Sequence, residues 1–406
     1  MSWEQKTLGE LLEALIDHRG RTPKKLGTDF VANGVPVLSA QLVTNGFIDW
    51  SNTRFVDQQT FELWMPQKLK KSDVLLTSEA PLGRTAILNR EQNVVLGQRL
   101  FALRGKRGVL DNHYLHYWLR SDKGQAVLTS HAQGTTVIGI RQSSLRSISV
   151  DLPSITTQKA IADVLGALDD KIAANQRVLE LGSLLLREKY QTFCRGNLIP
   201  FEVVAFEVRD KIHPSLVSGD TPQVSLEHFG KKSLWLKRWG QSSEVESTKS
   251  QFRRGDLLFG KLRPYFHKVS VADVDGICST DVLVIRAKDD RHQMLVALAA
   301  NSDAVVDQAV MNSNGTRMPR AKWQDIAKCA IPNPKRADVQ EFCDAAKQVF
   351  QLATKLIFEN QVLAATRDEL LPLLMNGKIT VAEAKEAAGD VGVVKQNQQE
   401  EGDGSV

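Results

Sequence analysis

Residues 165–186 read LGALDDKIAANQRVLELGSLLL, and residues 349–370 read VFQLATKLIFENQVLAATRDEL. In both stretches an apolar residue returns at every seventh position, from Leu165 to Leu186 and from Val349 to Leu370. A seven-residue apolar step is typical of the seam of a coiled coil. We therefore predict two long helices that pair with each other. Plain core packing in a helical domain is the alternative.

The seam positions of the two stretches correspond at a constant offset of 184 residues. The predicted helix interface consists of Leu165, Leu168, Ile172, Asn175, Leu179, Leu186, Val349, Leu352, Leu356, Leu363 and Leu370. Asn175 lies on the first seam, and Asn360 lies near the corresponding point of the second. A buried polar residue in a seam can fix the register of the helices at some cost in stability.

Polar residues, proline and glycine mark the predicted ends of these helices. Thr156 or Thr157 can cap the first helix. We expect Pro372 to end or kink the second helix and Gly377 to stop it. A first helix over 157–193 would be about 55 Å long at about 1.5 Å per residue.

The regions that precede the two helices repeat each other. Four segments recur in the same order at offsets of 179 to 183 residues, and they are 69–76 with 252–259, 100–106 with 282–288, 134–136 with 315–317, and 148–153 with 327–332. Short apolar runs in these regions are typical of strands between turns. The matches indicate a duplication, although any two α/β segments share some strands and turns.

The predicted fold class is α/β (α+β), with two copies of a mixed domain separated by two long antiparallel coiled-coil helices in a pseudo-two-fold arrangement. The predicted boundaries are 1–152 for the first mixed domain, 153–197 for the first helix, 198–332 for the second mixed domain, 333–381 for the second helix and 382–406 for the tail. The tail is rich in Gly, Gln and acidic residues, so we predict that it is disordered.

The charge of the chain suits a polyanionic partner without proving one. The formal net charge is +5 over 406 residues. Residues 383–406 carry six acids and two lysines, or −4, which leaves +9 on the rest. The four cysteines show no C-x-x-C pair, which argues against a disulfide framework and against a zinc site. We expect a cytoplasmic protein, because no signal peptide and no run of about 18 apolar residues is present.

Motifs of catalysis are missing from the sequence. There is no G-x-x-x-x-G-K-[ST] phosphate loop, no G-x-G-x-x-G turn and no H-E-x-x-H zinc helix. Asn333-Pro-Lys-Arg336 is not the N-P-P-Y tetrapeptide of adenine methyltransferases, because it lacks the aromatic residue. His113 and His116 could share one face of a helix, but we expect ordinary surface histidines rather than a metal pair. We therefore predict no catalytic residue, no metal and no cofactor in this chain.

One stretch carries a resemblance to a known family. The run DLPSITTQKAIADVLGALDDKI at 151–172 closely resembles the conserved central region of the specificity subunits of type I restriction-modification systems. DLLFGKLRPY at 256–265 is similar to a strand and loop of the family's target-recognition domains. ELLPLLMNGKI at 369–379 resembles the end of its distal conserved region. The segment 335–340 is a looser copy, so the two helices are not expected to dock their partners identically.

The resemblance implies a non-catalytic subunit that reads a bipartite target in double-stranded DNA. Each mixed domain would read one half-site, and the helix pair would hold the two readers at a fixed separation. Two modification subunits would supply methyl transfer with S-adenosylmethionine, and separate restriction subunits would use ATP and Mg to translocate and cut. The helix pair would be the main docking surface for these partners. No membrane is implied.

Candidate DNA contacts lie in loops that the repeat brings into correspondence. Gly-Thr turns let the backbone approach a duplex closely, and Arg, Gln and Lys can bind bases or phosphates. The candidates are Arg84, Gln98, Arg99, Thr135, Thr136, Arg141, Gln142, Lys261, Arg263, Tyr265, Thr316, Arg317, Arg320 and Lys322. Tyr265 could stack on a base or simply pack. A surface turn with solvated charges is the alternative for each loop.

Two other classes of function remain open from the residues. A coiled-coil scaffold that binds only proteins would also need the long helices, and it would differ in having no DNA specificity. A nuclease with carboxylates scattered along the sequence would cut DNA without partners.

Overall fold

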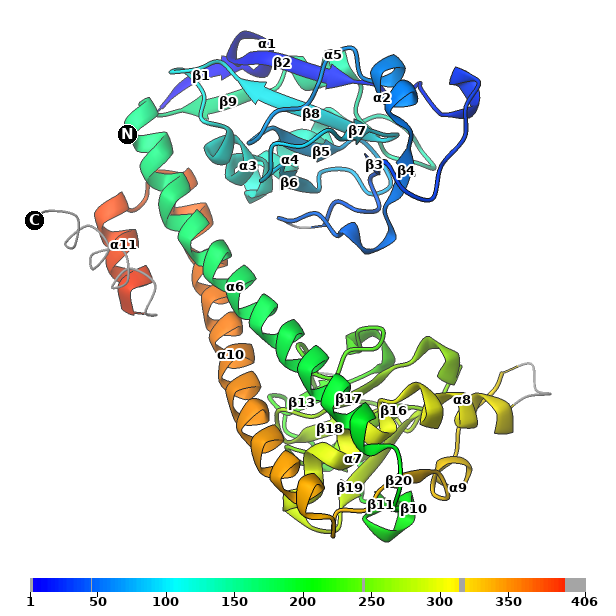
Figure 1. The fold of residues 1–406 in the computed structure, drawn as a ribbon. Helices are drawn as coiled ribbons and strands as arrows, with labels where there is room; N and C mark the ends of the chain where they lie inside the picture. Colours follow the sequence, from blue (N-terminus) through cyan, green and yellow to red (C-terminus); the bar gives the residue numbers. More distant parts are fainter. Residues whose placement is uncertain (1–2, 45, 243–244, 314–317, 391–406) are drawn as a thin grey trace, which may run out of the picture. The chain divides into compact units, whose positions relative to one another are not determined.

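The computed structural model describes residues 3–44, 46–242, 245–313 and 318–390. The chain forms two compact units, which Figure 1 shows as ribbons. Unit 1 consists of Met1–Lys171 with Val362–Val406, and unit 2 consists of Ile172–Gln361. Two long helices, α6 (Ile155–Phe193) and α10 (Ala337–Met375), contribute residues to both units.

Unit 1 contains nine strands besides its share of the long helices, among the residues that the structure describes. The strands are β1 (Glu4–Thr7), β2 (Leu12–Asp17), β3 (Val35–Leu38), β4 (Arg54–Val56), β5 (Val74–Thr77), β6 (Thr85–Ile87), β7 (Val95–Leu96), β8 (Leu100–Gly105) and β9 (Ser149–Leu152). The short helices are α1 (Leu8–Leu11), α2 (Gln58–Trp64), α3 (Asn112–Arg120), α4 (Asp122–Ser130), α5 (Gln142–Arg146) and α11 (Val381–Asp390).

The core of unit 1 is an antiparallel sheet in the order β2-β8-β5-β6. The central strand β8 is buried along its whole length, and α3 packs against β5, β6 and β8. A second sheet has the order β4-β3-β7, with β3 and β7 parallel. The helix α3 begins where Asp111 accepts a hydrogen bond from the backbone N–H of Tyr114, which is an ordinary N-cap.

Unit 2 has a corresponding set of elements. Its strands are β10 (Leu198–Pro200), β11 (Ala205–Val208), β12 (Lys211–Ile212), β13 (Pro222–Val224), β14 (Gly240–Gln241), β15 (Lys249–Phe252), β16 (Leu257–Gly260), β17 (Val269–Val271), β18 (Gly276–Cys278), β19 (Val282–Ala287) and β20 (Ala330–Pro332). Its short helices are α7 (Gln293–Ala300), α8 (Asp303–Asn312) and α9 (Trp323–Ile326).

The topology confirms the duplication that the sequence predicts. The sheet β11-β19-β16-β17 of unit 2 repeats the order β2-β8-β5-β6 of unit 1. The pair β10-β20 repeats β1-β9, and α7 packs on β16, β17 and β19 as α3 does on their counterparts. The strands β14-β13-β18 match β4-β3-β7, and unit 2 adds β15 and β12 to that sheet.

A buried ion pair also repeats. In unit 1 the guanidinium of Arg104 in β8 donates two hydrogen bonds to Asp73, each 2.7 Å long. In unit 2 Arg286 in β19 donates two bonds of the same length to Asp256. Both aspartates are almost fully buried, at 1% and 2% exposure. The aligned Asp and Arg positions of the sequence repeat are therefore matched in three dimensions as well.

Both predicted long helices are present, with ends that differ from the predictions. The N-cap of α6 is Ser154, whose Oγ accepts the N–H of Thr157, so neither threonine caps the helix. Pro372 does not end α10, because the helix runs on to Met375. Gly377, with φ at +63°, stops it as predicted: its N–H bonds to the Leu374 carbonyl in a left-handed cap.

The tail is not disordered from residue 382, as the composition had predicted. Helix α11 covers its first part, and Thr380 and Glu383 cap it reciprocally. Ala384 and Ala388, one helical turn apart, are buried. The physical reason is local: residues 381–388 are rich in Ala, Glu and Lys, which are good helix formers. Residues 391–406 lie outside the described part of the chain.

Within the described residues, no single helix is long and apolar enough to cross a membrane. The pair Asp290–Ala300 and Asp303–Asn312 meets that criterion only when taken together, with a bend of 62° between its members. Most of α7 is packed inside unit 2.

Candidate nucleic-acid interface

Three loops of unit 1 meet at one end of strand β5. They are the turn 78–84 between β5 and β6, the residues 97–99 before β8, and the segment 133–141 before α5. The N–H of Ser78 donates to the Arg99 carbonyl at 2.9 Å, and the N–H of Ile140 donates to the Ser78 carbonyl at 2.9 Å. The loops thus form one hydrogen-bonded platform, although they are up to about 60 residues apart in the sequence.

The tip of the third loop projects from this platform. Gln133 and Gly139 exchange two backbone hydrogen bonds of 2.8 and 2.9 Å, and residues 134–138 between them are exposed. Gly134 has φ at +114°, and a Cβ there would lie 2.2 Å from the Val137 carbonyl oxygen. Glycine is therefore required at this turn. The tip exposes Val137 and Ile138, at 49% and 53%, together with the two predicted threonines.

Unit 2 builds the same platform from the corresponding loops. The N–H of Lys261 donates to the Asp281 carbonyl at 2.8 Å, and the N–H of Ala321 donates to the Lys261 carbonyl at 3.0 Å. These two hydrogen bonds of unit 2 correspond to the bonds from Ser78 to Arg99 and from Ile140 to Ser78 in unit 1. The bridge between Leu262 and Arg320 likewise matches the bridge between Glu79 and Gly139.

Most of the predicted DNA contacts in unit 1 are exposed on or beside its platform. Arg84, Gln98, Arg99, Thr135, Thr136 and Arg141 are exposed, and Gln142 is half-buried in the first turn of α5. Arg99 is partly engaged, because its Nε lies 3.1 Å from Glu79 Oε1. The unit therefore presents a backbone-fixed set of loops with solvent-facing donors, which is the chemistry needed to bind phosphates and base edges.

The predicted residues of unit 2 have more varied surroundings. Lys261 is half-buried and donates from Nζ to the Thr280 carbonyl, and its burial lowers the pKa of the ammonium group. Arg263 is exposed and has φ at +51°. Tyr265 is 50% exposed, with its ring centroid 4.8 Å from that of Phe266, which is 44% exposed, so it does not simply pack in the core.

The remaining predicted residues of unit 2 lie in the third loop. Arg320 is exposed and its Nε lies 3.3 Å from Asp281 Oδ1. Lys322 is exposed, and its backbone N–H bonds to Asp325 at the start of α9. Thr316 and Arg317 lie outside the described residues.

Sequence reasoning missed the carboxylates of these platforms. Glu79 and Asp281 each form an ion pair with a predicted arginine, whereas the sequence-based candidates include no carboxylate. It also missed the exposed apolar residues Val137, Ile138 and Phe266. Val137 and Asp281 directly adjoin segments that the repeat aligns, but the sequence alone does not show which arginine each carboxylate meets.

The long helices pair in opposite directions within each unit. In unit 1, Arg367 of α10 donates to Asp169 of α6 at 2.6 Å. In unit 2, the Asn175 amide of α6 donates to Asn360 of α10 at 3.0 Å, and a Cβ at Gly182 would lie 3.3 Å from Val349. The contact partner in α10 moves to lower numbers as α6 advances, so each pairing is antiparallel.

The predicted interface residues are mostly buried. Leu165, Leu168, Asn175, Leu179, Leu186, Leu363 and Leu370 are buried, and Ile172, Val349 and Leu356 are half-buried. The prediction that Leu352 lies in the buried helix interface is wrong, because its side chain is 47% exposed. In this part of α10 the buried stripe instead runs through Phe350, Ala353 and Ile357, which belong to the core of unit 2. The helix must pack on the mixed domain as well as on α6, and this turns Leu352 outward.

A charged cluster fixes the helix pair to the mixed domain of unit 1. Asp169 accepts hydrogen bonds from Tyr117, Arg120 and Arg367 at 2.8, 2.9 and 2.6 Å. Burial alone raises the pKa of Asp169, but the two guanidinium groups outweigh it and hold the pKa below the usual value. His116 lies next to this cluster. It is not a surface histidine as predicted, because it is 3% exposed and burial lowers its pKa to about 3.

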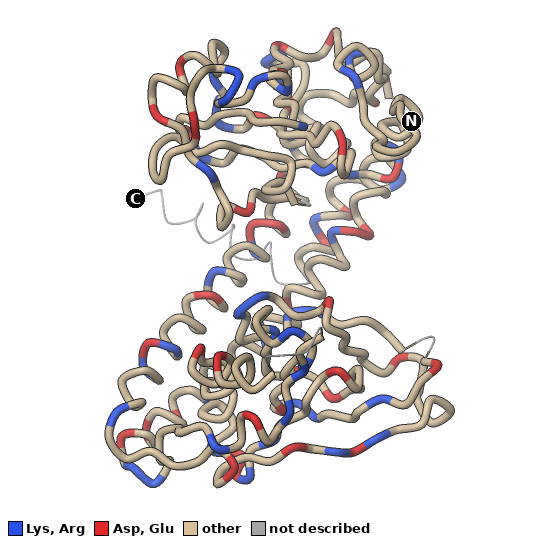
Figure 2. The backbone as a smooth tube through the Cα atoms, turned by 90° about the vertical axis from the view of Figure 1, so that its right-hand side faces the viewer, with Lys and Arg blue, Asp and Glu red and all other residues tan. Residues whose placement is uncertain are grey.

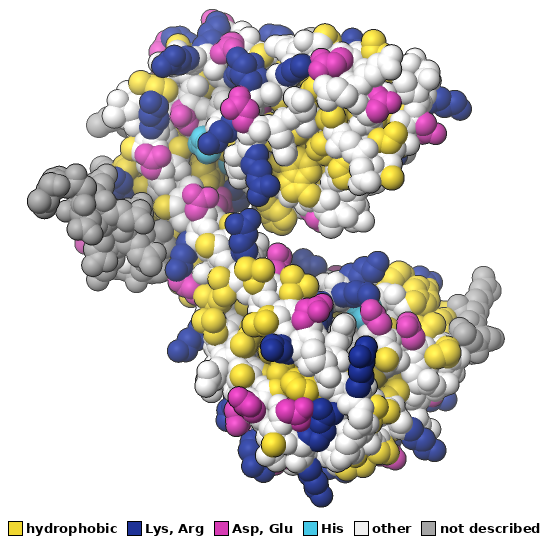
Figure 3. Space-filling view, in the orientation of Figure 1, with side chains coloured by type: hydrophobic (Ala, Val, Ile, Leu, Met, Phe, Trp, Pro, Cys, Tyr) yellow, Lys and Arg dark blue, Asp and Glu magenta, His cyan; other side chains and the backbone are white. Residues whose placement is uncertain are grey.

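An apolar stripe is exposed on the unit 2 part of α6. Val178, Leu181 and Leu185 lie on one helix face, at 45%, 60% and 57% exposure, and Leu184 beside them is 55% exposed. Figure 3 shows hydrophobic side chains at the surface along the helices. Exposed apolar patches of this kind mark surfaces that bind other proteins.

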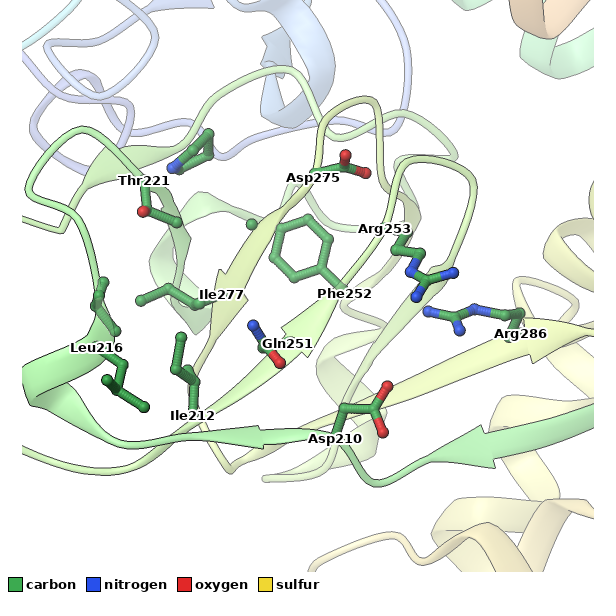
Figure 4. A pocket seen from close by; sticks show the side chains of 13 residues that line it. Asp210, Ile212, Leu216, Thr221, Gln251, Phe252, Arg253, Asp275, Ile277 and Arg286 are labelled. Carbon is green, nitrogen blue, oxygen red and sulfur yellow. The ribbon is translucent and has the colours of Figure 1, made fainter.

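A shallow pocket of about 440 Å³ lies elsewhere on unit 2. Figure 4 shows Arg253 and Arg286 side by side at its rim, with Asp210 nearby and Phe252 between the strands. Arg286 is the partner of Asp256 at the start of β16, whereas the three-loop platform is at the end of that strand. The pocket is therefore not part of the platform.

Lys and Arg are spread over both units and interleaved with Asp and Glu, as Figure 2 shows. Among the described residues, no group of three or more His, Cys, Asp or Glu could hold a metal ion.

Comparisons with known proteins give a consistent set of relatives. Residues 1–181 match the family model "Type I restriction modification DNA specificity domain". The chain is 24% identical over 300 residues to the type I restriction enzyme EcoDI specificity subunit of Escherichia coli, covering 63% of this chain and 66% of that protein. It is 22% identical over 408 residues to the putative type I restriction enzyme MjaX specificity subunit of Methanocaldococcus jannaschii, covering 93% of this chain and 94% of the relative.

A solved structure shares the fold. The crystal structure of the type I restriction-modification system S subunit from M. genitalium aligns with a TM-score of 0.54 and 16% identity. The alignment covers 92% of this chain and 96% of that one.

Proposed function

We propose that the chain is a type I restriction-modification specificity subunit and gives a methyltransferase and restriction complex its DNA sequence specificity. Residues 1–181 match the DNA specificity domain of that family, and the relatives that the chain resembles are specificity subunits. Each unit reads one half of a bipartite target in double-stranded DNA. The observation that carries this proposal is the duplicated three-loop platform, in which the same backbone hydrogen bonds present different side chains. A protein that reads two different half-sites needs this combination of a constant frame and variable contacts.

The proposal includes a division of labour. This chain supplies no methyl transfer and no cleavage. Two modification subunits bind S-adenosylmethionine and flip the target adenine, and restriction subunits use ATP and Mg. The exposed stripe of Val178, Leu181 and Leu185 is the candidate docking surface for the modification subunits. A protein scaffold without DNA specificity would use the same stripe but would have no need of two matched loop platforms.

The helix pair acts in this proposal as a spacer. Helix α6 has 39 residues, which corresponds to about 58 Å at about 1.5 Å per residue. Half-sites on one face of B-DNA lie about 34–36 Å apart per turn, so a stiff helix pair of this length can select a spacing, whereas a flexible linker would accept many.

The test is to replace Arg141 and Gln142 by Ala and to assemble the variant with its modification subunits. The DNA that has been incubated with this complex is then sequenced for methylated adenines, which gives the recognised target. We expect a relaxed or weakened first half-site with an unchanged second half-site and unchanged subunit assembly. Loop variants of both units that all keep the wild-type target would favour the scaffold instead. The purified chain with DNA and Mg should neither cut nor methylate.

A further inference from the structure

The two platforms have the same backbone and different charges. Three positions are matched by the backbone bonds and bridges, and they hold Glu79 and Leu262, Arg99 and Asp281, and Gly139 and Arg320. Each platform therefore has one arginine and one carboxylate at these positions, but in different places. In unit 1 the residue directly before strand β8 is the arginine, Arg99. In unit 2 the residue directly before the corresponding strand β19 is the carboxylate, Asp281.

Within each platform the arginine and the carboxylate form an ion pair. Arg99 Nε lies 3.1 Å from Glu79 Oε1, and Arg320 Nε lies 3.3 Å from Asp281 Oδ1. The arginine side chains are 52% and 55% exposed. Within the described residues neither guanidinium pairs with a second carboxylate, and more than half of each arginine side chain is accessible to a ligand.

These ion pairs are not needed for the fold. Pairs exposed to this degree contribute little to stability, typically less than about 1 kcal/mol. The same platform also forms with Leu262 in the place of Glu79 and with Gly139 in the place of Arg320. The frame consequently tolerates any of these side chains, and its charge pattern can differ between the units without a change of backbone.

The chemistry of the pairs fits base reading in the major groove. A guanidinium fork binds O6 and N7 of guanine, and a carboxylate accepts a hydrogen bond from N4 of cytosine. A carboxylate also repels phosphate, which disfavours binding to the backbone of unrelated DNA. While DNA is absent, the carboxylate holds the arginine in one orientation, so less freedom is lost on binding.

We propose that the three matched positions determine which bases each unit reads, with Glu79 and Arg99 serving the first half-site and Asp281 and Arg320 serving the second. This inference rests on the proposed function and assigns its specificity to particular side chains. The permuted charges explain how one duplicated domain could read two different half-sites.

The experiment uses the full chain assembled with its modification subunits and a DNA library in which both half-sites are randomised. The variants are Arg99→Gln, Glu79→Gln, Arg320→Gln and Asp281→Asn. The measured quantity is the base preference at each position of the methylated products. We expect each variant to change the preference by about 10-fold or more at one or two positions of its own half-site, as loss of one direct base contact does, and to leave the other half-site unchanged.

Two matched controls lie at the opposite ends of the same strands. Arg107→Gln lies just after β8 and Asp290→Asn lies just after β19, and both residues are exposed, so neither variant should change the target. If all four platform variants keep the wild-type preference in both half-sites, this inference is overturned while the proposed function stands. If the wild-type complex itself shows no base preference, the proposed function fails and the inference fails with it.

Discussion

The side-chain amide of Asn175 in α6 donates a hydrogen bond to the amide oxygen of Asn360 in α10 at 3.0 Å, and a second one to Glu359 at 2.8 Å. Asn175 is only 4% exposed, and the next seam residue, Leu179, is buried. A shift of either helix would place this amide against apolar side chains without partners, at a cost of about 1–3 kcal/mol. The pair therefore selects one register of the two helices.

The first prediction concerns this pair. Asn175→Ala should lower the free energy of unfolding by about 1–2 kcal/mol, because the half-buried amide oxygen of Asn360 loses its donor. Asn175→Leu combined with Asn360→Leu should recover most of that loss but allow more than one register. Urea unfolding measures the stability, and cysteine cross-linking between the helices measures the register. Equal costs for the double and single changes would show that the two amides are not coupled.

The second prediction concerns Asp169, where α6, α10 and α3 meet. Asp169→Asn should destabilise unit 1 by about 3 kcal/mol, because Arg120 would be left as a largely buried cation without a counter-charge and Arg367 would keep only Asp368 as its partner. The matched control is Asp170→Asn on the same helix. Burial and the charge of Asp169 raise the pKa of Asp170, so losing its charge should change stability by less than about 0.5 kcal/mol. Similar effects of the two substitutions in urea unfolding would contradict this account.

The third prediction is the pH dependence of that contribution. The pKa of Asp169 is lowered in the folded chain, so its stabilising effect is fully present above the unfolded value of about 3.9. The effect is lost as the pH falls through the lower folded value. The difference in stability between the wild type and Asp169→Asn should stay constant between pH 7 and about pH 5 and shrink below about pH 4. A difference that instead grew on acidification would reverse the assigned direction of the shift.

The parts of the fold that the sequence could predict are those set by short-range periodicity and by the duplication. The seven-residue step located the helices to within a few residues, and the alignment of Asp73 with Asp256 placed equivalent residues in correspondence, although their ion pairs with Arg104 and Arg286 were seen only in the structure. Leu352 and His116 were misplaced because their surroundings come from other parts of the chain. Leu352 is turned outward by the packing of α10 on the mixed domain, and His116 is covered where α3 meets the long helices.

The candidate site shows the same division. The loops around Gly134 and Lys261 could be identified from the repeat, because a Gly-Thr turn and a basic loop are visible in the sequence. The ion-pair partners of Arg99 and Arg320 could not be identified from the sequence. Glu79 and Asp281 lie on other loops, about 20 to 40 residues away in the sequence, and contact the arginines only because the fold brings these loops together. Backbone hydrogen bonds between loops have no signature in one sequence.

The fourth prediction tests the docking surface. Leu181→Glu places a charge in the exposed stripe and should weaken binding of the modification subunits by about 10-fold or more, because a hydrophobic interface must then bury a carboxylate. The fold should be unaffected, since Leu181 is 60% exposed. The control Glu341→Gln changes an exposed charge on the other long helix, α10. Analytical ultracentrifugation of the mixed subunits gives the affinity, and wild-type affinity for Leu181→Glu would exclude this stripe as the docking surface.

The fifth prediction tests the spacer. Seven residues are inserted after Gln176 in α6, and seven more before Glu359 in α10. One added heptad in each helix keeps the seven-residue period of the seam. The inserted sequences are chosen so that Asn175 and Asn360 still form their hydrogen bond. The insertion lengthens the helix pair by about 10.5 Å, and successive base pairs of B-DNA are about 3.4 Å apart. The spacing between the two half-sites should therefore increase by about three base pairs. The sequence of each half-site should stay the same. Sequencing of methylated adenines reads both quantities in one experiment. An insertion in α6 alone breaks the seam and should abolish methylation, which controls for the need to lengthen both helices. If the doubly lengthened chain is active and its half-sites keep the original separation, the helix pair does not set the spacing.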